Sequence, residues 1–105
     1  MSKAMLAETQ ASVQLMAAYV SVGQAAMAYH HAALERKQAR RRYVELRNEW
    51  LTDNDYGRSM KDALETPDFF EVTDDAYRAF VDARRIERNA LRRLESQCRR
   101  AGGDS

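Results

Sequence analysis

A long run without helix-breaking residues is the sequence feature that most constrains the fold. Residues 3–51 contain no proline and a single glycine, Gly23. Alanine, glutamine, glutamate, leucine, methionine and arginine dominate this run, and all of them favour helix. With 4 Gly and 1 Pro in 105 residues, the chain lacks the turn residues that a β-sandwich or barrel requires. The sequence therefore predicts an all-α protein whose first helix covers about residues 3–51.

Turn-forming residues separate this first helix from the rest of the chain. Residues 52–57 read TDNDYG, which predicts a break. Ser59 with Asp62, and then Thr66 with Pro67, indicate a short helical linker over about residues 59–71. Thr73 is followed by Asp74 and Asp75, and acidic residues favour the first turn of a helix. This predicts a last helix over about residues 74–100. We expect these elements to form an antiparallel helical hairpin within a single domain, residues 1–105.

The spacing of apolar side chains predicts which faces of the helices are covered. At 100° per residue, the first helix is apolar on two opposite faces, whereas the last helix has one apolar stripe. We call the first set the N-terminal stripe: Leu6, Val13, Met16, Val20, Met27 and Leu34. The opposite face carries Val22, Ala25, Tyr29, Ala32, Ala39, Tyr43, Leu46 and Trp50. The stripe of the last helix is Tyr77, Phe80, Ala83, Leu91, Leu94 and Cys98, and Cys98 is expected to be a small buried hydrophobic residue.

The predicted helices differ in length, and this difference leaves one segment uncovered. At 1.5 Å per residue the first helix is about 74 Å long and the last about 40 Å. In an antiparallel hairpin, paired residue numbers then sum to about 125, and residues 3–24 have no partner. We expect residues 1–34 to self-associate through the N-terminal stripe, giving an intermolecular helical bundle, while residues 35–100 form the hairpin. In the alternative, Gly23 breaks the helix and residues 3–22 fold back as a third helix of a monomeric bundle.

Charge is distributed unevenly although the net charge is only +1. Residues 36–42 (RKQARRR) and residues 84–100 are basic, and the segment between them is acidic. Arginine, which suits phosphate contacts, far outnumbers lysine, although biased codon usage would explain this equally well. The hairpin register brings the two basic blocks together, with Asp74 and Asp82 expected to pair with Arg78. The candidate anion-binding residues are Arg40, Arg41, Arg42, Arg85, Arg88 and Arg92.

Two charged residues interrupt the apolar faces that the hairpin brings together. Arg36 lies between Ala32 and Tyr43 on the first helix, and Glu87 lies between Ala83 and Leu91 on the last. Their positions agree with the hairpin register, and a buried charge is costly unless it is paired. We therefore predict an Arg36–Glu87 salt bridge, at least partly buried, that fixes the register.

No motif in the sequence indicates catalysis. There is no phosphate-binding loop, dinucleotide-binding glycine motif or HExxH zinc motif, and a lone cysteine excludes a disulfide scaffold. Residues 53–57 match a calcium loop poorly, because the glycine and the last ligand are misplaced. We expect no catalytic residue, metal, cofactor or small-molecule substrate. The expected function is that of a non-catalytic oligomeric binding or scaffold protein, whose partners are further copies of itself. The alternative is an accessory protein that uses these arginines to bind nucleic acid without sequence preference. The possible partners other than further copies of the chain are therefore nucleic acid or an acidic protein.

The sequence predicts neither a signal peptide nor a membrane span in the N-terminal region. Residues 9–34 are free of charged side chains and long enough to cross a bilayer. However, glutamine, serine and histidine interrupt them, and much of the remainder is alanine. We expect a cytoplasmic protein without a membrane-spanning helix, and secretion without a leader stays open.

The general plan of the chain resembles that of the WXG100 family of small secreted helical hairpins. The similarity lies in a length near 100 residues, two helices and a central tryptophan, Trp50, before a glycine-containing turn. Trp50 is followed by Leu51 and Thr52 rather than by the family's x-Gly, and the C-terminus lacks the Tyr-x-x-x-Asp/Glu export signal. The resemblance implies a secreted helical factor as a second alternative function.

Overall fold

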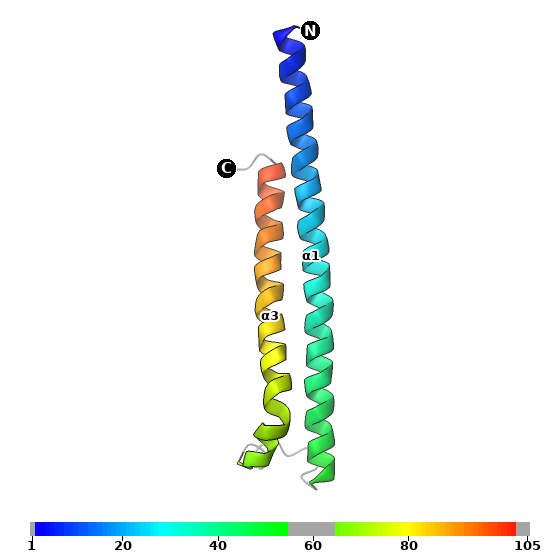
Figure 1. Cartoon of the computed structure of the whole chain (residues 1–105), viewed down its shortest axis with the longest axis vertical. Helices are drawn as coiled ribbons and strands as arrows, with labels where there is room; N and C mark the ends of the chain where they lie inside the picture. The colour runs from blue at the N-terminus through cyan, green and yellow to red at the C-terminus, as the bar shows by residue number, and fades with distance from the viewer. Residues whose placement is uncertain (1, 55–64, 103–105) are drawn as a thin grey trace. The chain divides into compact units, whose positions relative to one another are not determined.

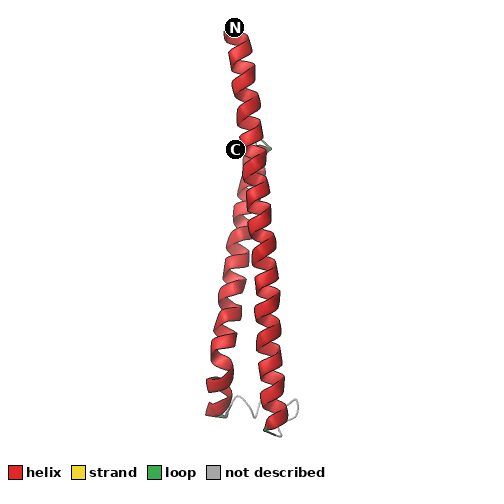
Figure 2. Cartoon of the chain, turned by 45° about the vertical axis from the view of Figure 1, so that its right-hand side comes forward, coloured by secondary structure: helices red, strands yellow, loops and turns green. Residues whose placement is uncertain are grey.

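The computed structural model describes residues 2–54 and 65–102, and these residues form two helices. Helix α1 covers Lys3–Asp53 and helix α3 covers Pro67–Ala101 (Figure 1). The described residues contain no strand (Figure 2). The predicted all-α fold is therefore confirmed. Ser59 and Asp62, which were predicted to begin the linker, lie outside the described residues.

Helix α1 is a single helix with polar groups at both ends. The Ser2 hydroxyl accepts a hydrogen bond from the Met5 amide at 3.2 Å, as an N-cap residue does. At the other end, the amide and the side chain of Asn54 both donate to the Trp50 carbonyl, at 3.1 and 2.9 Å. Gly23 lies within the helix, so the predicted alternative in which it breaks the helix is wrong. The residues that follow it, QAAMA, are good helix formers, and they outweigh the roughly 1 kcal/mol that one glycine costs.

Helix α3 begins earlier than predicted, at Pro67 instead of near residue 74. Proline is well suited to the first helical position because its ring fixes φ and its missing amide would have no helical partner. Thr73 does not cap a new helix. Its hydroxyl donates to the Phe69 carbonyl, one turn back, at 2.7 Å. The last turn of the predicted linker and the predicted last helix are thus one continuous element.

The chain divides into two compact units, each of which contains part of both helices. In the unit Ala32–Glu87, α1 and α3 lie side by side and run antiparallel (Figure 1). The Tyr43 and Phe80 rings are 6.5 Å apart, and the Trp50 ring meets Phe69 edge-on at 5.2 Å. Tyr43 and Phe80 have residue numbers that sum to 123, close to the predicted 125. This unit is the expected antiparallel helical hairpin.

The second unit combines Met1–His31 with Arg88–Ser105. Within it, α1 extends past the C-terminal end of α3 (Figure 1). Ala25 is buried and Val22 and Tyr29 are half-buried, whereas every residue of 3–17 is exposed. We call residues 3–17 the overhang. Its exposure agrees with the length argument from the sequence.

On each helix, a row of half-buried or buried residues recurs at alternating intervals of three and four residues. On α1 these half-buried or buried positions are Val22, Ala25, Tyr29, Ala32, Arg36, Ala39, Tyr43, Leu46 and Trp50. On α3 they are Phe69, Thr73, Ala76, Phe80, Ala83, Glu87, Ala90, Leu94, Gln97 and Ala101. This spacing is typical of coiled coils, and we call these positions the seam.

Three residues assigned to the apolar stripe of α3 lie beside the seam and are exposed. Tyr77, Leu91 and Cys98 each follow a seam position by one residue, which turns them about 100° away from it. The expectation that Cys98 is buried is therefore wrong, since Cys98 is exposed. Small or polar side chains, such as Ala90 and Gln97, occupy the covered positions instead.

Candidate functional site

The N-terminal stripe is the most conspicuous uncovered surface of α1. Its six members, Leu6, Val13, Met16, Val20, Met27 and Leu34, have exposed fractions between 42% and 67%. Large apolar side chains are common singly on protein surfaces, but a regular row of them is unusual. The part of the chain that the structure describes covers none of these six.

The position of the stripe on α1 explains why it is uncovered. The seam occupies the opposite face of the helix, so α3 packs where the stripe is not. Beyond α3, the overhang has no covered face at all. It therefore also exposes Met5 and Leu15, and Tyr19, two residues after the overhang, is exposed as well; the exposed fractions of the three are 46–60%. The sequence analysis missed these three residues because it followed the seven-residue spacing, although the length argument already indicated that no face of this segment was covered.

The stripe has few charges around it. Lys3, Glu8 and Glu35 are the only Lys, Arg, Asp or Glu residues among residues 3–35, and all three are exposed. None of them forms an ion pair with another residue that the structure describes. His30 and His31 are also exposed, with ring centroids 6.1 Å apart. The surface is thus an apolar row on a nearly uncharged stretch of helix.

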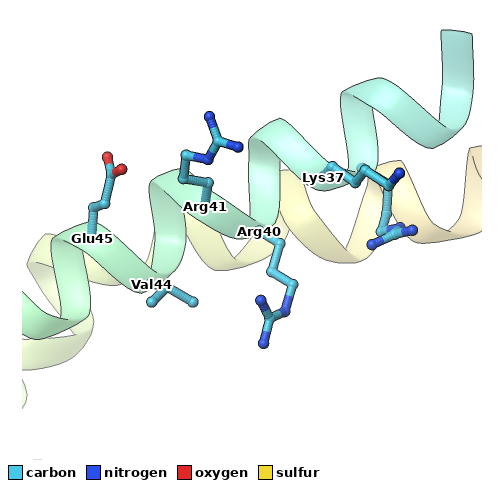
Figure 3. A pocket seen from close by; sticks show the side chains of 6 residues that line it. Lys37, Arg40, Arg41, Val44 and Glu45 are labelled. Carbon is cyan, nitrogen blue, oxygen red and sulfur yellow. The ribbon is translucent and has the colours of Figure 1, made fainter.

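The candidate anion-binding arginines are all exposed, but they do not form a cradle. On α1, a shallow hollow of about 480 Å³ is lined by Arg36, Lys37, Arg40, Arg41, Val44 and Glu45. Figure 3 shows the side chains of Arg40 and Arg41 pointing in opposite directions. An anion would therefore meet separate guanidinium groups along a helix surface rather than one enclosed site.

Two arginines of α3 have acidic neighbours on the same helix. Arg78 Nε lies 3.0 Å from an Asp74 oxygen, and Arg85 Nη2 lies 3.6 Å from Asp82 Oδ1. The predicted pairing of Asp82 with Arg78 is therefore wrong, because Asp82 turns toward Arg85, three residues along. Both pairs are exposed to solvent, where such contacts contribute little.

The structure places Arg36 and Glu87 together, as the sequence predicts. Arg36 Nε donates to both carboxylate oxygens of Glu87 at 3.2 Å. The two side chains are 28% and 20% exposed, so the pair is partly buried. Their residue numbers also sum to 123, the same register as that of Tyr43 and Phe80.

A second hollow, of about 390 Å³, is mainly aromatic. It is lined by Tyr43, Phe69, Phe70, Thr73, Asp74 and Tyr77. Two of its polar groups already have partners. The Thr73 hydroxyl donates to the Phe69 carbonyl, and the Asp74 carboxylate is paired with Arg78. Across the described residues, no group of three or more His, Cys, Asp or Glu side chains is placed to hold a metal ion. Neither described helix is both long and apolar enough to cross a bilayer.

Comparisons of this chain with protein-family models, with curated protein sequences and with solved structures find no match.

Proposed function

We propose that this is a non-catalytic helical protein that self-associates through the N-terminal stripe and acts as a binding or scaffold protein. The observation that carries the proposal is the exposure of all six stripe residues on one continuous helix. A helix that is apolar on two opposite faces needs two partners, and α3 supplies only one.

The energetics favour covering the stripe. Burying one Val, Leu or Met side chain contributes about 1.5–3 kcal/mol. An overhang of this length would also be marginally stable as an isolated helix in water, because helix formation gains most of its stability from packing. Association would therefore stabilise the overhang while removing the exposed apolar row from water.

The proposal is tested by changing one stripe residue to a charged one. Val20→Glu should dissociate the assembly, measured by sedimentation equilibrium at micromolar concentration, while circular dichroism shows that the helices persist. Val72→Glu is the matched control, because Val72 is similarly exposed but lies on α3. A monomeric unmutated chain, or equal weakening by both substitutions, would contradict the proposal.

A second candidate function is sequence-independent binding of nucleic acid. The supporting observation is that Arg40, Arg41, Arg42, Arg85, Arg88 and Arg92 are all exposed. Of these six, Arg85 alone forms an ion pair within the described residues. Exposed guanidinium groups along a helix suit contacts to a phosphate backbone.

A further inference from the structure

We infer that the partner covering the N-terminal stripe is a second copy of this chain whose α1 runs antiparallel, with the two-fold axis near Val20. The inference rests on the proposed function, to which it adds the identity and the orientation of the partner. Three observations carry it: the symmetry of the stripe, the basic run that follows it, and the charges that flank it.

The stripe is symmetric about Val20. Leu6, Val13, Val20, Met27 and Leu34 are evenly spaced by seven residues, so that the row matches itself when it is turned end for end. In such a pair, Leu6 of one copy lies level with Leu34 of the other, over a contact of about 42 Å. Each overhang is then level with about residues 23–37 of the second copy.

The basic run after the stripe opposes a parallel arrangement. Arg41 occupies the next position at the same spacing, within the basic segment 36–42. Parallel helices would place Arg41 against Arg41 and bring two strongly basic segments side by side, where like charges repel. In the antiparallel pair, Arg41 of each copy lies beyond Lys3, where α1 of the other copy begins.

The charges beside the stripe are complementary only when the helices are antiparallel. Lys3 precedes Leu6 by three residues and Glu35 follows Leu34 by one, so both lie on the same side of the stripe, about 60° and 100° from it. Antiparallel helices bring equivalent sides face to face. Lys3 of each copy then approaches Glu35 of the other, giving two ion pairs per dimer. In parallel helices Lys3 and Glu35 lie at opposite ends of the contact and cannot pair.

The second copy would reach the stripe without displacing α3. Stripe and seam lie on opposite faces of α1, and the seam positions of α1 are already half-buried or buried. The antiparallel pair therefore leaves both hairpins intact. It covers the stripe of both copies at once, as a closed two-fold interface must.

Cysteine cross-linking measures the orientation directly. Leu6→Cys and Leu34→Cys are made separately in the full chain with Cys98→Ser, since Cys98 is exposed and would otherwise react. Each variant alone should give no cross-linked dimer with a short bis-maleimide, because its own thiols lie roughly 40 Å apart in the antiparallel pair. Mixing the two variants should give a cross-linked dimer.

Charge reversal tests the predicted ion pairs. Lys3→Glu and Glu35→Lys should each weaken dimerisation by about tenfold, and the double variant should restore it. Glu45→Lys is the matched control: Glu45 is exposed on α1 four residues beyond Arg41, outside the antiparallel contact, and its reversal should leave the dissociation constant unchanged.

The outcomes separate the orientation from the proposed function. Cross-linking of Leu6→Cys to itself, or no cross-link between the mixed variants in an assembled sample, would overturn the antiparallel pair while self-association stood. Failure of the double charge reversal to restore dimerisation would also overturn it. A monomeric unmutated chain would overturn the proposed function, and the antiparallel pair with it.

Discussion

Arg36 and Glu87 show how two charges can set the register of a small hairpin. Both occupy seam positions that apolar residues would otherwise fill, and each is less than one-third exposed. A slip of one helical turn would place both charges against apolar side chains, at a cost in desolvation. The pair could be predicted from the sequence because each residue interrupts an apolar row at matching heights. The exposure of Cys98 could not, because a rotation of one residue decides it.

Glu87→Ala should destabilise the hairpin by about 1.5 kcal/mol, between the values typical of exposed and of buried ion pairs. The loss arises because Arg36 stays half-buried without its partner. Urea unfolding at fixed protein concentration measures it. Asp82→Ala is the control, since its pair with Arg85 is 65% exposed on both sides and should contribute almost nothing. Equal losses for the two variants would show that the Arg36–Glu87 pair does not stabilise the register.

At the scale of the helices, the first turns of α3 show how neighbouring residues of the same type differ. Phe69 is 2% exposed and packs against Trp50, forming a small core with Leu51, whereas Phe70 is 47% exposed. The sequence alone does not distinguish the two phenylalanines. Phe69 occupies a seam position and Phe70 is turned about 100° away from it, and the sequence analysis placed both in a separate linker instead of in α3.

Phe69→Ala should cost about 3 kcal/mol of unfolding free energy, because it removes a buried ring and leaves a cavity beside Trp50. Phe70→Ala, the neighbouring control, should cost under about 1 kcal/mol. Urea unfolding followed by Trp50 fluorescence measures both, and the emission of Phe69→Ala should shift to the red as water reaches the indole ring. Similar costs for the two substitutions would place Phe69 outside the core.

Existence and direction of the helices were more predictable than their boundaries. The absence of proline and the single glycine in residues 3–51 predicted α1 almost to its end at Asp53. The boundary of α3 was missed because Thr73, a good N-cap residue by type, instead bonds to the carbonyl one turn back. Local signals at a helix start compete with the gain from packing Phe69 and Thr73 in the seam, and packing decides.

At the scale of the whole molecule, a net charge of +1 hides segments of opposite sign. The exposed stripe could be predicted from spacing and length, because one partner helix covers only one of the two apolar faces of α1 and is too short to reach the overhang. The arrangement of the arginines was missed, because grouping them by register alone ignores the 100° turn between neighbouring residues of a helix. Arg40 and Arg41 are adjacent in sequence and point apart (Figure 3).

If the exposed arginines bind nucleic acid, replacing Arg85, Arg88 and Arg92 by Gln should weaken binding equally for all sequences. Each lost phosphate contact should lower the slope of log affinity against log salt by about 1. Fluorescence anisotropy with two unrelated oligonucleotides over a salt series measures this, while circular dichroism confirms that the variant is helical. Arg78→Gln is the control: Asp74 lies 3.0 Å from Arg78 and already neutralises it, so this substitution should change the slope less than each of the three replacements does. Because phosphate contacts are strongest at low ionic strength, an unmutated chain that binds neither oligonucleotide at about 50 mM salt would rule out this function.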